Sequence, residues 1–426
     1  MTLKFRILAG SALAAVLASG SVSAETLGDA VSAAILSNPQ LDAQRVESDL
    51  ARENLEQARA GGRTTVTAGA SAGYQYTDTN SPFSVNNGDQ QALSAQLQAT
   101  KPIYTGGRIS ANVRQATAGI NAAEAQYDAA EQDLILDVVT AYMDVRRDRE
   151  TVAIRQNNID VASEQERASK DRFEVGVVTR TDVSLSTANL EGARAAKASA
   201  EAALEASVAN YSFLTGLVPG DLVPPPPVPP LPASLEEATR IGLENNPDMI
   251  AARHNERAAM EAIEAARAQG RPSVNLVGTA QIQETYADRN VQNSSVSGVL
   301  QGSIPILTGG LVKSQTKAAR LRRDQARQQI DTLDRSIRAQ VASAWFGYDA
   351  ALRGIEASKR QVDAAEIAYD GAKEELAVGV RTTLDVLNQE QQLFEARLTL
   401  VQAERDAYVA AHQLLRATGQ LTQPQP

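Results

Sequence analysis

The chain has 426 residues, of which 43% are apolar but only 4% are aromatic, and its formal net charge is -10. Such an acidic chain lacks the positive surface that nucleic-acid binding requires, so the composition argues against that class of function. Because aromatic side chains normally dominate globular cores, their scarcity favours packed helices with small side chains. The absence of cysteine excludes disulfides, thiolate metal sites and an acylated N-terminal cysteine.

The first 24 residues form a predicted secretory signal peptide. Lys4 and Arg6 precede an apolar stretch, and small residues follow it up to Ala24, where cleavage is expected. The alternative is an N-terminal membrane anchor. No run of 18 apolar residues follows, so the sequence predicts an exported protein without a membrane-spanning helix.

The exported part is expected to consist of two tandem repeats. Their first segments share Leu, Ala, Asn-Pro and Arg at an offset of 208 residues, and from Pro102 onward the offset is 203. A proline-rich linker between them favours an extended polyproline II strap. The expected divisions are a first repeat at 25–220, a linker at 221–232, a second repeat at 233–419 and a short polar tail at 420–426.

Each repeat contains an alternating segment that predicts a β-hairpin, at about 64–101 and 272–306. In the first hairpin, Val66 and Ala68 share one strand face while polar residues share the other, which is a period of two. A turn-rich stretch, SPFSVNNGD, separates its two strands. The sequence therefore predicts four strands per chain, each with an apolar and a polar face. A soluble sheet with one wet face remains the alternative to a sheet that crosses a membrane.

A repeated octapeptide joins each hairpin to the segment that follows, as PIYTGGRI in the first repeat and PILTGGLV in the second. Proline lacks the N–H that a strand ladder uses, so we expect each proline to end strand pairing. The glycine pair frees the backbone to turn. The predicted junction residues are Pro102, Gly106, Gly107, Pro305, Gly309 and Gly310.

Long helices are predicted after each junction. From about Gly107 to Val175 the chain has no proline, and apolar residues such as Val138 and Val145 recur at intervals of seven. A helix of this length is a rod of roughly 100 Å, which no compact domain contains. The sequence therefore predicts long antiparallel helices with coiled-coil-like packing.

Strands that cross a membrane must form a closed barrel, because every backbone polar group has to be paired. Four strands cannot close. Two chains would give eight strands, whose side chains nearly fill the interior, and three chains would give twelve, which leaves a lumen. The hairpins therefore favour an oligomer.

Two similar turns, VGVVTRTDV and VGVRTTLDV, separate the paired helices of each repeat. Their glycines can take the positive φ that ends a helix, and Thr179 or Thr382 can cap the next one. Asp182 and Asp385 stand three residues later, the acidic position of a capping box. The turns consist of Val175, Gly176 and Val177 in the first repeat and of Val378, Gly379 and Val380 in the second.

Catalysis has little support in the sequence. His254 and His412 have no ligand spacing around them and are interpreted as surface residues, and Trp345 is expected to pack. No phosphate loop, nucleophile elbow or metal cluster is present. We therefore expect no enzyme activity, no cofactor and no metal, and the energy for any transport must come from a partner.

The signal peptide, the tandem halves and their shared order of short helix, Asn-Pro, hairpin, P-I-x-T-G-G, long helix, VGV turn and second helix resemble the TolC family of outer-membrane exit ducts. The resemblance covers essentially the whole exported chain. It implies a mixed α and β membrane protein, a homotrimer with a shared twelve-stranded transmembrane β-barrel and a periplasmic α-barrel of twelve helices. It also implies partners: a periplasmic adaptor, or membrane fusion protein, and an inner-membrane transporter of the ABC, RND or similar class.

The same resemblance implies that the VGV turns form the periplasmic tip, which contacts the adaptor and keeps the tunnel closed. Arg381 would pair with Thr181 and Asp182, while Asp385 would line the mouth and select cations. Two departures from the family pattern stand out, because Asn388 replaces a second acidic site and Leu376 replaces an aromatic latch partner. Closure is therefore expected to rest mostly on Arg381. Capping by Asp182 and Asp385 is compatible with these roles.

One competing hypothesis is a periplasmic trimeric coiled coil or an adaptor-type protein without a pore. Such proteins also have long heptads and a signal peptide, but they have no reason to carry duplicated amphipathic hairpins. Within the duct hypothesis, export of drugs and type I secretion of proteins both remain open, because a wide tunnel contacts its cargo loosely.

Overall fold

The structure is a computed structural model, and it describes residues 25–78, 88–286 and 291–423. The expected signal peptide and most of the SPFSVNNGD turn lie outside these residues. The elements are α1 (Leu27–Ser37), α2 (Pro39–Ala60), β1 (Thr65–Thr77), β2 (Gly88–Tyr104), α3 (Arg108–Glu174), α4 (Arg180–Thr215), α5 (Leu235–Asn245), α6 (Pro247–Ala268), β3 (Ser273–Tyr286), β4 (Val291–Ser303), α7 (Leu311–Ala377) and α8 (Thr383–Thr418).

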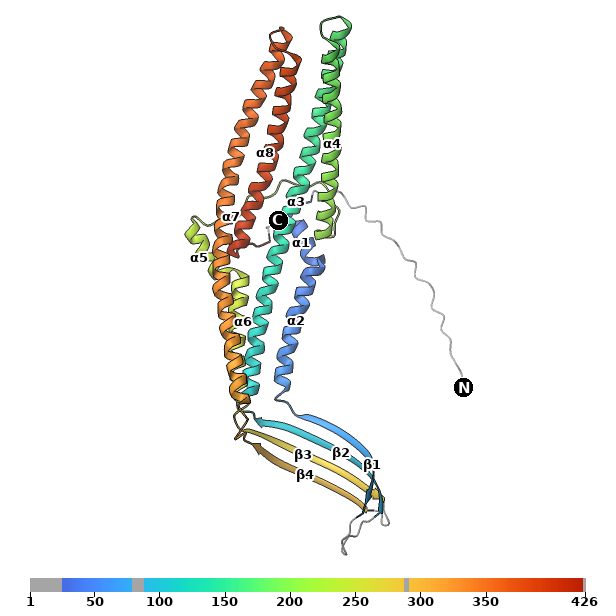
Figure 1. Cartoon of the computed structure of the whole chain (residues 1–426), viewed down its shortest axis with the longest axis vertical. Coiled ribbons are helices and arrows are strands. Elements are labelled where there is room, and N and C mark those ends of the chain that lie inside the picture. Colours follow the sequence, from blue (N-terminus) through green and yellow to red (C-terminus); the bar gives the residue numbers. More distant parts are fainter. Residues whose placement is uncertain (1–24, 79–87, 287–290, 424–426) are drawn as a thin grey trace, which may run out of the picture.

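The molecule is an elongated rod with the sheet at one end and two helical hairpins at the other (Figure 1). The helices α3 and α7 have 67 residues each, which corresponds to roughly 100 Å at 1.5 Å per residue. They run from the sheet to the hairpin tips, where α4 and α8 return. The short helices α1 and α5 lie about midway along the rod. No helix among the described residues combines the length and the apolar character that crossing a membrane demands.

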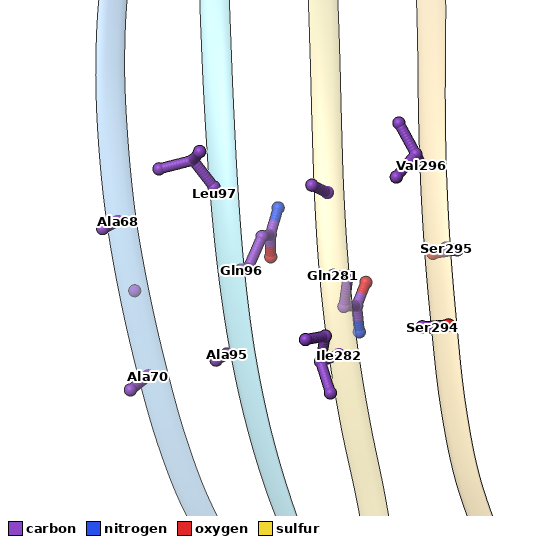
Figure 2. Close-up of a pocket in the computed structure, with 12 residues that line it drawn as sticks. Ala68, Ala70, Ala95, Gln96, Leu97, Gln281, Ile282, Ser294, Ser295 and Val296 are labelled. Atoms are coloured by element: carbon purple, nitrogen blue, oxygen red, sulfur yellow. The ribbon is translucent and has the colours of Figure 1, made fainter.

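The four strands form one antiparallel sheet in the order β1-β2-β3-β4. In the middle of the sheet the register aligns residues of like character: Leu97 and Val296 lie in an apolar row, and Gln96 and Gln281 lie in the adjacent polar row. Figure 2 shows these neighbouring rows in the middle of the sheet. The expected alternation of apolar and polar faces is therefore present.

One expectation about the junction is wrong. Pro102 does not end strand β2, which continues to Tyr104. Pro102 lies opposite Asn275, and the register shifts between Pro102 and Tyr104. An irregularity of this kind tolerates a residue without an N–H. In the second repeat, Pro305 does lie beyond the end of β4.

The tandem halves repeat specific contacts as well as elements. Asn38 caps α2 and donates from its side-chain amide to the carbonyl oxygen of Leu214, at 3.4 Å. Asn246 caps α6 and donates in the same way to Ala417, at 3.2 Å. Each Asn-Pro pair thus ties the start of one helix to the end of the helix that returns from the tip.

The main core lies midway along the rod, where α1 and the extended linker meet α3 and α4. Tyr142 and Tyr211 are fully buried there. The hydroxyl of Tyr142 donates to the carbonyl oxygens of Glu25 and Val223, at 3.0 and 2.6 Å, and the hydroxyl of Tyr211 donates to the Glu25 carboxylate at 2.5 Å. These bonds hold Glu25, just before α1, and the linker against the long helices.

The interpretation of His412 as a surface residue is also wrong. Its side chain is only 3% exposed, its Nδ1 lies 2.8 Å from the carbonyl oxygen of Tyr408, and its ring lies 4.5 Å from the Tyr408 ring. Burial lowers its pKa, so the neutral imidazole is favoured. His412 is therefore a core residue of α8.

Candidate functional site

The two VGV turns have nearly the same backbone geometry. Gly176 and Gly379 have φ of 77° and 79°, a region that side chains with a Cβ adopt at a cost. The N–H of Val177 donates to the carbonyl of Arg172, and that of Val380 donates to Glu375, each at 2.9 Å. These bonds close the preceding helix in the manner of a Schellman motif. The valines of both turns are exposed, at 71% to 75%.

Both helices that leave the turns begin with a capping box. Asp182 and Asp385 each accept hydrogen bonds from the backbone N–H of the capping threonine, at 2.8 and 3.0 Å, and from its hydroxyl, at 2.8 and 2.6 Å. The N–H and then the hydroxyl of Thr179 lower the pKa of Asp182; the hydroxyl and then the N–H of Thr382 lower that of Asp385. The two carboxylates are therefore fixed as anions.

Arg381 lies in the second turn and forms an ion pair within its own hairpin. Its Nε contacts the carboxylate of Glu375, and the two side chains are 43% and 46% exposed. No contact joins Arg381 to Thr181 or Asp182 among the described residues of this single chain. The predicted link across hairpins is thus not made within one chain, and the role of Arg381 in closure stays a prediction.

The other predicted aperture residues also lie at or beside the tips. Thr181 is exposed in the first turn of α4, Asn388 is exposed in the second turn of α8, and Leu376 is half-buried near the end of α7. The carbonyl of Leu376 accepts a hydrogen bond from the N–H of Gly379 at 3.1 Å. The structure therefore places these residues within a few turns of Asp182 or Asp385 along their own hairpins.

Sequence reasoning missed Glu390, the most unusual residue near the tips. Its side chain is 2% exposed, and neither carboxylate oxygen has a partner among the described residues. It lines a cavity of about 300 Å³ between α8 and the α3–α4 hairpin, together with Arg155, Asn189 and Phe394. Desolvation raises its pKa to about 7. Its position in the buried stripe of α8, between Val386 and the pair Leu393 and Phe394, was the available signal.

The first hairpin holds its own interior carboxylate in a different setting. Glu166 accepts hydrogen bonds from Lys170 and from the hydroxyl of Thr187, each at 2.8 Å. These bonds lower the pKa of Glu166, and the bond from Lys170 has the largest effect. Nearby, the hydroxyls of Ser169 and Ser186 lie 2.9 Å apart in the buried contact between α3 and α4.

At the opposite end of the rod, the glycine pairs take the expected turns. Gly106, Gly107, Gly309 and Gly310 have φ between 57° and 89°. A Cβ on Gly106 would lie 2.6 Å from the Cβ of Arg271, whose guanidinium donates to the Gly106 carbonyl at 2.9 Å. Glycine at that position therefore permits a close approach as well as a turn.

The described residues contain no group of three or more His, Asp or Glu side chains arranged to hold a metal ion. At the tips, Asp182 and Asp385 act in helix caps and Arg381 pairs with Glu375. The arrangement places ionised carboxylates at the ends of two long hairpins and offers polar groups that can link neighbouring hairpins. None of the tip residues described above pairs a nucleophile with a base.

Comparison with known proteins gives a consistent result. The sequence model of the family described as outer membrane efflux protein matches residues 30–217 and 240–420. The chain is 31% identical over 425 residues to the outer membrane efflux protein BepC of Brucella suis, covering 97% of this chain and 90% of BepC. It is 28% identical to the outer membrane protein TolC of Escherichia coli, covering 94% and 83%. Its fold is similar to the Campylobacter jejuni CmeC outer membrane channel, with a TM-score of 0.81, 18% identity and coverage of 94% and 87%.

Proposed function

The chain belongs to the outer membrane efflux protein family, and on this premise we propose that three copies form one channel-tunnel. It is an outer-membrane protein with most of its mass in the periplasm, and it conducts exported cargo. In the proposed trimer, four strands from each chain close a twelve-stranded barrel, and the long helices form a tunnel that reaches toward the inner membrane.

The observation that carries this proposal is the open sheet. Among the described strands, β1 and β4 each have one edge without a partner strand. Unpaired N–H and C=O groups in lipid cost several kcal/mol each, so an open four-stranded sheet is unfavourable in a membrane. Closure by further copies pairs the edges, and twelve strands leave room for a lumen.

The polar face of the sheet suits a water-filled lumen. Its rows carry amides and hydroxyls, and the hydroxyls of Ser71 and Ser94 lie 2.7 Å apart, as those of Thr279 and Ser297 do at 2.6 Å. The middle rows contain no charged residue: they are Thr67, Gln98, Thr279 and Ser297; Gly69, Gln96, Gln281 and Ser295; and Ser71, Ser94, Gln283 and Asn293. The barrel would therefore discriminate little between ions, and selectivity would lie at the tips.

At the periplasmic end we assign the aperture to the residues of the two tips. Asp385 and Asp182 supply fixed negative charge, and Arg381 of one hairpin would bind Thr181 and Asp182 of a neighbouring hairpin. The exposed valines of the VGV turns would contact a periplasmic adaptor, through which an inner-membrane transporter delivers cargo. The pore-less coiled-coil hypothesis loses its support, because both repeats match the efflux protein family.

Conductance of single channels in planar bilayers tests the aperture. Replacing Arg381→Ser should raise the conductance of the resting, closed channel, and replacing Asp385→Ala should lower the preference for cations over anions. Arg180→Ser, which changes an exposed arginine on the other turn, is the matched control and should leave conductance unchanged. If Arg381→Ser stays as tightly closed as wild type, the closure assignment is wrong.

Deleting the gene tests the function in the cell. If the channel exports small toxic compounds, the deletion strain should become more sensitive to drugs; if it serves type I secretion, specific proteins should disappear from the medium. A wild-type phenotype in both assays would contradict the proposal. Recovery of the protein in the soluble periplasm rather than the outer membrane would also contradict it.

A further inference from the structure

The first five turns of α7, next to the sheet, are strongly basic. Residues 311–328 contain six cationic side chains and a single acidic one, Asp324, in a chain whose net charge is -10. Arg323 pairs with that Asp324 at 2.9 Å. We call the remaining five cations the basic foot of α7, and they are Lys313, Lys317, Arg320, Arg322 and Arg327.

The side chains of the basic foot have no ionic partner within the described part of the single chain. All five residues are exposed, and none forms an ion pair with a residue that the structure describes. Farther along the same helix, arginines are paired one turn away, as in Arg338 with Asp334 and Arg353 with Asp349. The foot therefore combines a local excess of cations over acidic residues with side chains that form no ion pair in the described chain.

Three of these cations follow one side of the helix. Lys313, Arg320 and Arg327 are seven residues apart and so lie on one face, with Lys317 beside them. This face is distinct from the one that carries the buried Ala319, which lies about 100° away around the helix. Lys313, Arg320 and Arg327 therefore lie on a face of α7 that is exposed in the single chain.

Apolar residues directly precede the basic foot and face solvent in this chain. Ile306 and Leu307, between β4 and α7, are 95% and 92% exposed. At 1.5 Å per residue, Lys313, Lys317 and Arg320 lie roughly 3, 9 and 14 Å beyond the start of the helix. Exposed apolar residues followed by cations within this distance are typical of a chain that leaves the hydrocarbon layer and enters the headgroup layer.

The first repeat shows that the junction does not require such charge. The equivalents of Lys313 and Arg320 in α3, at the offset of 203, are Ser110 and Thr117. The equivalent of Lys317 is Arg114, which already pairs with Glu261 at 2.8 Å. The same turn from strand to helix thus forms with few cations, so the charge on α7 calls for a separate explanation.

We propose that the basic foot of α7 binds the anionic headgroups of phospholipids in the periplasmic leaflet of the outer membrane. The site rests on the proposed orientation, with the sheet in the membrane and the helices in the periplasm. Lys313, Lys317 and Arg320 bind the headgroup phosphates, while Ile306 and Leu307 lie among the acyl chains. The contact fixes the height of the junction in the bilayer once in each chain.

Counting bound lipids by native mass spectrometry tests the site. The full-length protein, purified in dodecyl maltoside, is incubated with palmitoyl-oleoyl phosphatidylglycerol or with the matching phosphatidylcholine. Wild type should retain the anionic lipid preferentially. Because a cation near an anionic surface contributes about a fivefold change in affinity, the triple variant Lys313→Gln, Lys317→Gln and Arg320→Gln should weaken phosphatidylglycerol binding roughly 100-fold.

Two variants serve as controls. The set Arg335→Gln, Lys359→Gln and Lys373→Gln removes three exposed cations farther along α7 that form no ion pair with described residues, and it should leave lipid binding unchanged. The exchange Lys313→Arg, Lys317→Arg and Arg320→Lys keeps the charge and should keep the preference. Equal retention of both lipids by wild type, or an unchanged preference in the triple Gln variant, would overturn the proposal.

Two further outcomes would also overturn it. If millimolar inorganic phosphate displaces phosphatidylglycerol completely, the foot is a site for free anions rather than for lipid. If the triple Gln variant alters ion selectivity in planar bilayers while its lipid count is unchanged, the basic foot lines the lumen. The proposed function is judged separately, by whether the wild-type protein forms a channel at all.

Discussion

The two helical hairpins have the same backbone fold, but each places an interior carboxylate in a different environment. In the first hairpin, Glu166 on α3 is held by Lys170 and Thr187, and its pKa is lowered. In the second, Glu390 on α8 has no partner among the described residues, and desolvation raises its pKa to about 7. At the offset of 203, Glu390 is the equivalent of Thr187, and Glu166 is the equivalent of Tyr369.

This exchange teaches that the repeated fold does not fix the charge state of its hairpins. In the first hairpin the carboxylate of Glu166 lies on α3, where Lys170 and Thr187 donate hydrogen bonds to it, so this carboxylate is ionised at neutral pH. In the second hairpin the carboxylate of Glu390 lies on α8 without a hydrogen-bond donor among the described residues, so its charge changes near neutral pH. The second hairpin is therefore the one whose packing we expect to depend on pH.

The largest expected effect is the pH dependence of the second hairpin. Because the folded pKa of Glu390 lies above the usual value of 4.5, its contribution to stability is fully present below about pH 4.5 and is lost as pH rises through about 7. At pH 8 the loss is about 3 kcal/mol. Hydrogen exchange of α8 amides, corrected for intrinsic rates, should show more opening at pH 8 than at pH 5.5, and Glu390→Gln should remove the difference.

The surroundings of Glu390 define the control. Arg155 from α3 and Glu395 from α8 line the same cavity, α4 contributes no titratable residue to that lining, and Tyr369 of α7 feels the charge of Glu390. Glu395→Gln, an exposed change on the same helix, should preserve the pH dependence. Amide protection of α8 that is equal at both pH values in wild type would contradict the comparison.

Next in size is the strain at the two turns, which should be equal. Gly176→Ala and Gly379→Ala each place a Cβ on a residue with φ near 78°, and each should destabilise its hairpin tip by roughly 1–2 kcal/mol. Apart from the adjoining residues, no atom of the described chain lies within 4 Å of either added Cβ, so backbone strain should dominate the effect. Hydrogen exchange at the two tips measures it. A large difference between the variants would show that the turns are not equivalent.

The caps should have smaller but still equal effects. Thr179→Ala and Thr382→Ala each remove the hydroxyl that bonds the third helical residue, which should cost about 1 kcal/mol in the first turn of α4 or α8. Thr→Ser at the same positions keeps the hydroxyl and serves as the control. Hydrogen exchange in these first turns measures the loss. If only one of the two Thr→Ala changes lowers amide protection, the two capping boxes match in geometry but not in their contribution to stability.

Local patterns predicted much of this fold and part of the candidate site. The hairpins, the positive φ of the junction glycines and both capping boxes follow from residues within a few positions of one another. The position of Pro102 inside β2 could not be predicted in this way. It depends on the register shift in the pairing of β2 with β3, and β3 lies far along the chain. The burial of His412 and Glu390 likewise depends on which helix packs against α8, and one helix pattern does not specify its neighbour.

The smallest expected effect concerns the ion pair that only the second tip has. The equivalents of Glu375 and Arg381 in the first repeat are Arg172 and Val178, so no such pair exists there. Because both partners are nearly half exposed, Glu375→Gln should weaken amide protection of the second turn by less than about 1 kcal/mol, and salt should abolish the difference. Glu174→Gln, near the first turn, is the control. A larger loss that persists at high salt would mean that Glu375 holds Arg381 in place before any neighbouring hairpin binds it.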